Sequence, residues 1–251
     1  GDRAPVSPFL SLPFVTQNRF LAVVNTVESF ATTDAYVRES FLKSLATQFD
    51  TLPESFRQFK LMEAFLHIAV AGTPESASVI DPAMKLVALF TPADFDAYVL
   101  PSLRHLLTSG TQPVKSALLS TVGLYVKLLP EALVTGQLYP MLTRSMQPDA
   151  TTAMKDAAVR SLVHLAPKLP EKTLNGEVAR FLEACLGASE SLLRINTVVC
   201  IGKIAAGFGP EVRGRLVSQA FSRALKDGVP EMKKAAVVMV NNCKYDIDGL
   251  V

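Results

Sequence analysis

The stretch TTAMKDAAVRSLVHLAPKLPE, residues 151–171, decides the fold of this chain. It opens with turn residues, continues as an amphipathic helix and ends on the pair Pro170-Glu171. Its apolar residues recur at helical spacing and line one face: Met154, Ala158, Leu162, Leu165 and Leu169. Such a face must pack against a neighbour, so the stretch predicts one element of a larger helical assembly.

The proline that closes this stretch recurs along the whole chain. Pro13, Pro53, Pro92, Pro130, Pro170 and Pro210 are separated by 40, 39, 38, 40 and 40 residues, and four of the six directly precede a glutamate. The residue before a proline is driven out of the α region, so a helix ends there. Proline and an acidic neighbour both suit the first turn of the next helix. Each mark therefore predicts the end of one helix and the start of another.

Turn residues divide each repeat again, for example at 109–113 and 226–230, which gives two helices per repeat. A period near 39 residues with two helices is typical of HEAT repeats. The predicted fold class is therefore all-α, an α-solenoid of about six HEAT-type helical hairpins. Pro101 and Pro140 fall inside two of the first helices, where we expect a bend.

The predicted domain organisation follows the prolines. Residues 1–12 are a linker or boundary segment, and residues 13–251 form the solenoid. The opening residues lack the apolar core of a signal peptide, and we expect the chain to be part of a longer protein. The six predicted hairpins are residues 13–52, 53–91, 92–129, 130–169, 170–209 and 210–251.

Composition and charge limit the partners and the cellular compartment that we expect for the protein. The 251 residues are 49% hydrophobic and carry a net charge of +2, which gives no sign of a dedicated nucleic-acid or membrane surface. Residues 154–251 are mildly basic, with 14 Lys and Arg against 10 Asp and Glu.

The three cysteines, Cys185, Cys200 and Cys243, are an odd number and are too widely spaced for a disulfide framework or a zinc site. No apolar run is long enough to span a bilayer, so we expect a cytoplasmic protein.

No catalytic motif, cofactor motif or metal motif is found in the sequence, so no catalytic, cofactor-binding or metal-binding residue is predicted. Gly202-Lys203 lacks the rest of a phosphate-binding loop and is interpreted as a helix-interior glycine. His67 and His105 stand at equivalent places in successive repeats, and a shared metal site is weighed against exposed helical histidines, which the missing ligands favour. His164 also lies alone in a helix. For Cys200, a buried thiol is favoured over a nucleophile.

Basic residues give two further features. Lys115, Lys155, Arg194 and Lys233 recur once per hairpin, and we expect this ladder to pair with turn acids such as Asp149 and Glu190. A positive patch is expected near the C-terminal end, where it would bind acidic protein segments, phospholipid headgroups or RNA, although solvated helix surface is the simpler interpretation. The candidate partner-binding patch consists of Lys203, Arg213, Arg215, Arg223 and Lys226.

Several stretches resemble the Scy-like pseudokinase family, also called N-terminal kinase-like proteins, in its HEAT-repeat region. The resemblance is closest in the last third of the chain, and it extends more weakly to residues 43–45 and 52–57. The stretches that carry it are Ser161–Leu169, Leu174-Asn175, Leu193–Ile204 and Ala220–Asp227.

The resemblance implies a scaffold in vesicle traffic between Golgi and endoplasmic reticulum, cytoplasmic or peripheral to Golgi membranes. Its expected partners are proteins of the trafficking or coat machinery. The family's kinase-like domain would precede residue 1, and the coatomer-binding tail of some members would follow residue 251. Neither catalysis nor coatomer binding is therefore assigned to any residue here, and no cofactor is expected.

The alternative function is a tRNA-export adaptor that binds RNA or nuclear transport factors, which the resemblance also implies for some members. The basic C-terminal half favours it, while the near-neutral total charge and the lack of an aromatic stacking platform oppose it. An enzyme is the third hypothesis, and it would need the kinase-like domain that this chain does not contain.

Overall fold

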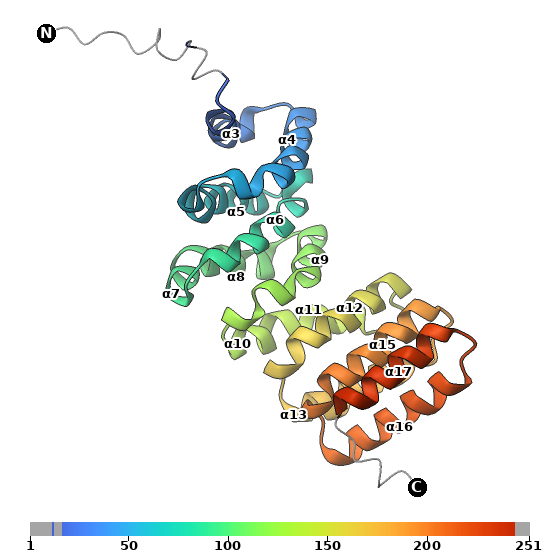
Figure 1. Cartoon of the computed structure of the whole chain (residues 1–251). Helices are drawn as coiled ribbons and strands as arrows, with labels where there is room; N and C mark the ends of the chain where they lie inside the picture. The colour runs from blue at the N-terminus through green and yellow to red at the C-terminus, as the bar shows by residue number, and fades with distance from the viewer. Residues whose placement is uncertain (1–11, 13–16, 244–251) are drawn as a thin grey trace, which may run out of the picture. The chain divides into compact units, whose positions relative to one another are not determined.

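The computed structural model describes residue 12 and residues 17–243 (Figure 1). Within these residues the chain forms helices and turns without a strand, which confirms the predicted all-α class. Contacts divide the chain into two compact parts, Gly1–Ala117 and Leu118–Val251, which we call the N-terminal and C-terminal parts. Pro13 and all of the predicted linker except Leu12 lie outside the described residues.

The N-terminal part is a succession of helices separated by short turns. Its first two helices are capped by side chains, since Asn18 and Asp34 accept backbone N–H bonds from Leu21 (3.1 Å) and Tyr36 (2.8 Å). Its α-helices are α3 (Arg19–Glu28), α4 (Ala35–Gln48), α5 (Met62–Val70), α6 (Ile80–Leu86), α7 (Pro92–Asp94), α8 (Leu100–Ser109) and α9 (Gln112–Ser120), whose end belongs to the C-terminal part. It also contains the 3-10 turns η1 (Phe30–Thr32), η2 (Phe49–Thr51), η4 (Pro74–Ala77) and η5 (Val87–Leu89). Its π-helical turns are η3 (Phe56–Leu61) and η6 (Phe95–Val99).

The C-terminal part continues the same alternation. The second helices α12, α15 and α17 pack side by side, and the first helix α16 packs on α14, α15 and α17 (Figure 1). Its α-helices are α10 (Glu131–Leu133), α11 (Tyr139–Ser145), α12 (Thr152–Leu165), α13 (Glu171–Thr173), α14 (Ala179–Cys185), α15 (Ser191–Ile204), α16 (Pro210–Lys226) and α17 (Pro230–Cys243). Its 3-10 turns are η7 (Val122–Leu124), η8 (Val126–Leu128), η10 (Ala166–Lys168) and η12 (Ala205–Gly207). Its π-helical turns are η9 (Val134–Leu138) and η11 (Leu174–Val178).

Proline marks lie at helix boundaries, as the sequence predicts. Pro92 and Pro210 occupy the first position of α7 and α16. Pro130 and Pro170 stand one position earlier, as N-caps with ψ of 142° and 143°. The sequence predicts Pro130 and Pro170 at the first helical position. Their extended ψ places them just outside the helix, so the helix begins at the glutamate that follows each proline. The glutamate still lies in the first turn, where the helix dipole favours it.

The period also appears in irregular backbone turns that the sequence pattern did not predict. A second helix ends on a 3-10 turn at η2, η5, η8, η10 and η12, and a first helix contains a π-helical turn at η3, η6, η9 and η11. In two first helices the π turn directly precedes the segment that holds Pro101 or Pro140. A π turn is a recognised cause of helix bending, so the irregularity falls just before each proline. Helix α16 lacks a π turn.

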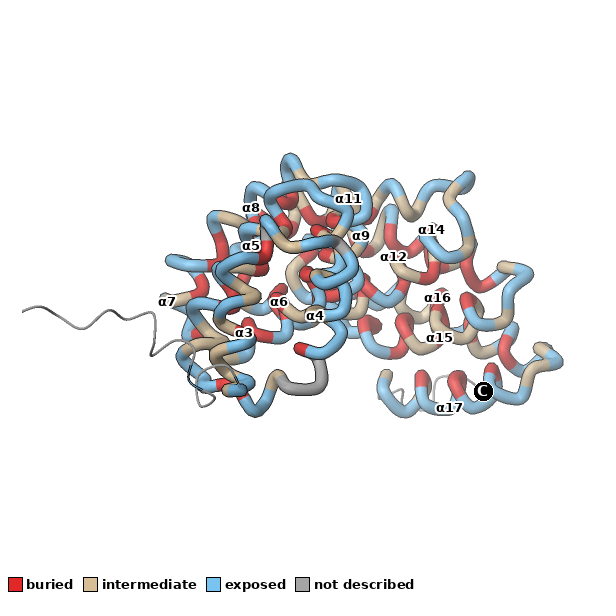
Figure 2. Tube along the Cα trace, turned by 90° about the horizontal axis from the view of Figure 1, so that it is seen from above, coloured by how far each residue is buried: buried red, intermediate tan, exposed pale blue. Residues whose placement is uncertain are grey.

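Apolar columns hold the hairpins together. Leu103, Leu142 and Leu182 recur at equivalent places in the first helices and are fully buried, while the equivalent Phe221 is half-buried. On α12 the predicted apolar face is buried from Ala158 onward, but Met154 is 38% exposed because it stands in the first turn of the helix. Figure 2 shows this buried side running along the helices. Burying each leucine contributes about 1.5–3 kcal/mol, against roughly 0–1 kcal/mol for an exposed ion pair.

Polar side chains add bonds between successive hairpins of the C-terminal part. The Ser161 hydroxyl donates to the Leu119 carbonyl at 3.0 Å, and the Asn196 amide donates to Asp156 Oδ1 at 2.6 Å. The Gly209 N–H donates to Asn175 Oδ1 at 2.9 Å. Each bond joins residues 34 to 42 positions apart. Neighbouring repeats are therefore fixed in register by specific partners as well as by apolar packing.

Candidate functional site

The three histidines do not assemble into a metal site. His67, His105 and His164 are exposed, and no group of three or more potential ligands forms among residues 17–243. The exposed helical positions predicted for His67 and His105 are confirmed. The imidazole of His164 lies over Gly123, where an added Cβ would come within 2.8 Å of the ring. Burial lowers the pKa of His164 below its usual 6.5, and repulsion from Lys203 and Lys127 lowers it further.

The cysteines are placed as inert thiols. Cys200 is fully buried, and burial raises its pKa to about 12. Burial likewise raises the pKa of Cys185 to about 11 and raises that of the half-buried Cys243. Nucleophilic chemistry requires the thiolate, which such pKa values suppress at neutral pH. The buried-thiol interpretation of Cys200 is confirmed.

Gly202 is a helix-interior glycine with a packing role. It is buried in α15, and an added Cβ would lie 2.8 Å from the Cα of Met239 on α17. The absence of a side chain lets the two helices approach closely. This confirms the structural interpretation of Gly202-Lys203.

The basic ladder is used mainly to close turns. Lys115 and Lys155 each donate to a carbonyl seven residues earlier, Thr108 at 3.0 Å and Pro148 at 2.7 Å. Neither lysine forms an ion pair with Asp149 or Glu190 among the described residues, because a long side chain in the first turn reaches back to the carbonyls of the preceding turn. Lys155 still acts electrostatically on Glu190, as the sequence predicts. Arg194 does pair with a turn acid, Asp227 of the next hairpin, at 2.8 Å. Hydrogen bonding from Arg194 lowers the pKa of Asp227.

The residues of the predicted basic patch do not form one compact cluster with a shared partner. Arg215 pairs with Glu183 on α14 at 3.2 Å, and Arg223 Nη1 lies 3.0 Å from the position of a Cβ on Gly187. Arg213 is half-buried and acts electrostatically on Cys243 at the end of α17. Lys203 stands on α15, where it acts on His164. Arg215 and Arg223 thus both lie toward α14 and the turn after it, Arg213 and Lys203 lie near other elements, and Lys226 is exposed at the end of α16.

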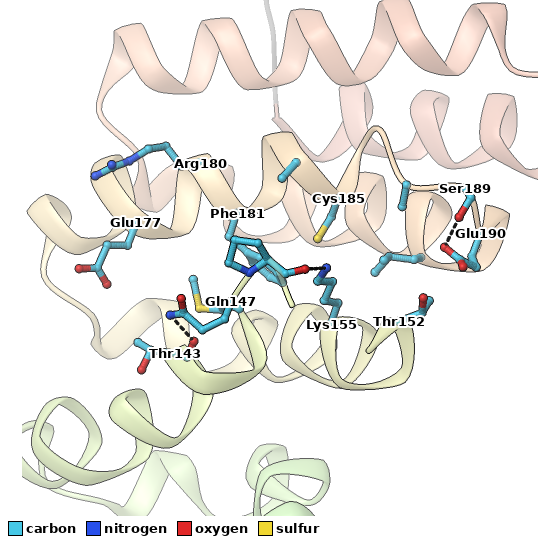
Figure 3. Close-up of a pocket in the computed structure, with 15 residues that line it drawn as sticks. Thr143, Gln147, Thr152, Lys155, Glu177, Arg180, Phe181, Cys185, Ser189 and Glu190 are labelled. Carbon is cyan, nitrogen blue, oxygen red and sulfur yellow. Dashed lines mark hydrogen bonds between the residues drawn. The ribbon is translucent and has the colours of Figure 1, made fainter. Parts of the chain in front are cut away.

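A cavity of about 630 Å³ lies between the fourth and fifth hairpins. In Figure 3, Arg180, Phe181 and Cys185 line it from the α14 hairpin, and Thr143 and Lys155 line it from the α12 hairpin. Its charged groups are already bonded within the protein. The Tyr139 hydroxyl donates to Glu177 at 2.9 Å, Arg180 donates to the Gly176 carbonyl at 3.2 Å, and the Ser189 hydroxyl donates to Glu190 at 2.8 Å. The cavity therefore combines apolar surface with charged groups that already have partners within the protein.

The N-terminal part has its own cavity of about 720 Å³, lined by residues of α4, α5 and α6 and by the turns beside them. Its main ion pair joins Glu75 to Arg38, 2.9 Å apart, and hydrogen bonding from Arg38 lowers the pKa of Glu75. Arg57, which also lines the cavity, pairs with Asp50 at 3.2 Å. These pairs join α4 and its neighbours, so their role is to hold hairpins together.

A basic surface of the C-terminal part lies on its second helices, and the predicted ladder and basic patch include only part of it. The second-helix segments, residues 118–129, 152–168, 191–207 and 230–243, carry eight Lys and Arg against two acids, Asp156 and Glu231. The first-helix segments, residues 130–145, 170–186 and 210–226, carry seven against five. Charge counted over alternate helices could have revealed this contrast, whereas charge counted over contiguous stretches averages it away.

We call the outward side of these segments the second-helix face. It combines exposed cations with exposed aliphatic side chains, and Leu124, Leu192 and Val238 are 47%, 62% and 52% exposed. Arg160 is bound to Asp156 at 3.0 Å. The residues of the second-helix face are Leu124, Lys127, Arg160, His164, Leu192, Lys203, Lys234 and Val238.

This architecture defines the class of the chain, an all-α protein built from repeated helical hairpins. No protein-family model matches it. The chain is 24% identical over 244 residues to the Dictyostelium discoideum protein named "Probable inactive serine/threonine-protein kinase scy1", a match that covers 96% of this chain and 29% of that protein. It is 31% identical over 144 residues to "Protein kinase domain-containing protein ppk3" of Schizosaccharomyces pombe, covering 57% of this chain and 22% of that protein.

The chain thus spans less than a third of the length of these two curated relatives. These matches support a Scy1-like relationship. Among solved structures, the crystal structure of Cex1p superposes with a TM-score of 0.66 at 16% identity, covering 97% of this chain and 49% of that one. That likeness shows the fold alone. Within residues 17–243, no helix has both the length and the apolar character that a membrane crossing requires.

Proposed function

We propose that this chain is the helical-repeat region of a Scy1-like, kinase-like protein and acts as a non-catalytic scaffold that binds other proteins. The observation that carries the proposal is a succession of stacked hairpins that aligns with the scy1 protein over 96% of the chain. Stacked helical repeats present long surfaces suited to macromolecular partners. The HEAT type of the repeats and the six proline-bounded hairpins are part of this proposal.

The non-catalytic role has support from the chemistry of the described residues. The thiols of Cys185 and Cys200 are protonated at neutral pH, and the charged groups around the larger cavities are bonded within the protein. One relative is itself named an inactive kinase. Calorimetry with ATP and Mg²⁺ tests this role, and we expect no saturable heat of binding. Saturable ATP binding by the isolated chain would contradict it.

The cellular setting we propose is vesicle traffic between Golgi and endoplasmic reticulum, in the cytoplasm or on the Golgi surface. Proximity labelling by the chain fused to a biotin ligase tests this setting. We expect coat and vesicle-tethering proteins to be enriched over the ligase alone. Enrichment confined to nuclear proteins would overturn the setting and leave the scaffold role intact.

A second candidate function is an RNA-binding adaptor in tRNA export, and the cationic second helices favour it. Binding dominated by phosphate contacts weakens steeply as salt rises. Titration of tRNA at several salt concentrations therefore separates the candidates. Weak binding with a shallow salt dependence would remove the RNA adaptor.

The partner-binding role of Lys203, Arg213, Arg215, Arg223 and Lys226 is also a proposal. Because Arg215 pairs with Glu183 on α14 while Arg213 acts electrostatically on Cys243 of α17, single charge reversals at each test different surfaces. Partner recovery in a pull-down should fall for a residue that contacts the partner and stay unchanged for one that does not. Unchanged recovery for all five reversals would discard the patch.

A further inference from the structure

Three lysines of the second-helix face have side-chain ammonium groups with no hydrogen bond or ion pair among the described residues. They are Lys127, Lys203 and Lys234, and they stand on three of the four second-helix segments. The other cations of these segments are mostly engaged, since Lys155 and Lys168 bind carbonyls while Arg160 and Arg194 bind Asp156 and Asp227. The three lysines therefore leave a positive charge available on one side of the helices.

Two of these lysines, Lys127 and Lys203, come from segments that pack on either side of α12, and the ring of His164 lies over Gly123 of the segment that carries Lys127. Lys127 of the third hairpin and Lys203 of the fifth both act electrostatically on His164 of the fourth. Asp156, one of the two acids of these helices, is mostly buried and held by Arg160 and Asn196. Exposed like charges without acids between them raise the local positive potential, which attracts anionic groups. The cluster thus favours an anionic partner.

The apolar side chains beside the cluster indicate which kind of anionic partner fits. Leu124, Leu192 and Val238 are aliphatic and about half exposed or more. The one aromatic residue in these second-helix segments, Tyr125, is fully buried with its hydroxyl donating to the Leu118 carbonyl at 3.0 Å. Single-stranded nucleic acid is bound largely by stacking on exposed aromatic rings, which these segments do not offer. Exposed aliphatic groups instead suit apolar side chains of a peptide.

We propose that the second-helix face of the C-terminal part binds an acidic protein segment that also carries aliphatic side chains. Lys127, Lys203 and Lys234 bind its carboxylates, and Leu124, Leu192 and Val238 pack against its aliphatic groups. This inference rests on the proposed scaffold function and adds to it a surface and a partner chemistry.

A fluorescein-labelled synthetic peptide of glutamates with a leucine at every third or fourth position is the probe. Fluorescence anisotropy measures its binding to the chain. We expect saturable binding that weakens as salt rises, because exposed ion pairs are screened. Replacing the leucines of the probe by serine should weaken binding several-fold, and replacing its glutamates by lysine should abolish it.

Variants of the chain locate the site. The double change Lys127→Glu with Lys203→Glu should weaken binding about tenfold or more. Arg144→Glu with Lys172→Glu, on α11 and α13, is the matched control, because it changes the net charge equally at exposed first-helix positions that belong neither to the face nor to the basic patch. It should leave affinity within about twofold. Circular dichroism melts confirm that both variants stay folded, as exposed side chains permit.

Several results would overturn the inference. Equal losses in both double variants would mean that only net charge matters. Tighter binding of poly(U) RNA than of the peptide would assign the face to nucleic acid. Absence of peptide binding would remove the acidic partner. In that last case, continued enrichment of trafficking proteins by the fused ligase would show that the scaffold function stands while the surface is misplaced.

Discussion

At the scale of single residues, the molecule depends on positions where one atom decides how close two helices come. Gly202 and Gly123 are examples, since a Cβ at either would approach a neighbouring side chain or backbone at 2.8 Å. Gly136 is free of such restriction, because nothing lies within 4 Å of the place where its Cβ would stand. The packing density of the interior explains why the same substitution has opposite effects at different sites.

Gly202→Ala should destabilise the C-terminal part by about 1–3 kcal/mol, because the new methyl group meets the backbone of Met239. The free energy of unfolding from urea titration measures the effect. Gly176→Ala is the matched control, since its Cβ would meet only Arg180 Nη2 at 3.9 Å. The control should be neutral or gain up to about 1 kcal/mol. A tolerated alanine at position 202 would contradict the close helix approach.

Lys203→Ala should raise the pKa of His164 toward its usual value, because one of the repelling charges is removed. Burial remains, so the recovery should be partial. Titration of the histidine resonances by NMR measures the shift, and Lys226→Ala should leave it unchanged. The lowered pKa also fixes the sign of a pH effect. The folded state prefers neutral His164, so its contribution to stability falls as pH drops from about 6.5 through the folded-state pKa.

At the scale of elements, the second helices both build the stack and expose its charge. α15 packs between α12 and α17, and polar bonds fix its position on both sides. Asn196 binds Asp156 of the preceding hairpin, and Arg194 binds Asp227 of the following one. A bond between elements about one repeat apart can form only when the hairpins stack in one register.

Asp227→Asn should lower the melting temperature at neutral pH, because it weakens the charged bond from Arg194. The pKa of Asp227 is lowered by that bond, so its contribution is present above the unfolded-state pKa and is lost as pH falls through the folded-state pKa. Melting curves of the variant and the original chain should therefore converge in acid. Asp149→Asn, at an exposed turn position, is the control and should behave like the original chain. A constant difference at every pH would contradict this account.

At the scale of the whole molecule, no hairpin buries its apolar side alone. Leu182 of α14 belongs to a column that continues in the first helices of neighbouring repeats, and it is fully buried. In such arrays stability is shared between adjacent repeats. The two compact parts each contain several hairpins and so satisfy this requirement separately.

Leu182→Ala should destabilise the C-terminal part by about 2–5 kcal/mol through the cavity it leaves. Because neighbours depend on α14, amide hydrogen exchange should quicken in α12 and α16 as well as in α14. Leu225→Ala, at a side chain 54% exposed, is the control and should change little. Faster exchange confined to α14 would mean that the hairpins are stable independently.

The sequence by itself determined the class of fold. Proline with an acidic residue one or two positions later acts on the backbone within a few residues, so the helix boundaries at Pro92, Pro130, Pro170 and Pro210 could be predicted from local physics. The same holds for the buried thiol of Cys200 and the interior position of Gly202, whose apolar neighbours along the helix are visible in the chain.

Only the tertiary structure decided which charges meet. Arg213 and Arg215 are close in sequence, but Arg215 pairs with α14 and Arg213 acts electrostatically on the end of α17. Lys127, His164 and Lys203 come from three hairpins and share one face. The π turns of the first helices were equally invisible, since they occur with and without a following proline. The physical reason is the same in each case. Stacking brings together side chains about 39 residues apart, and their neighbours are set by packing between hairpins that no local pattern encodes.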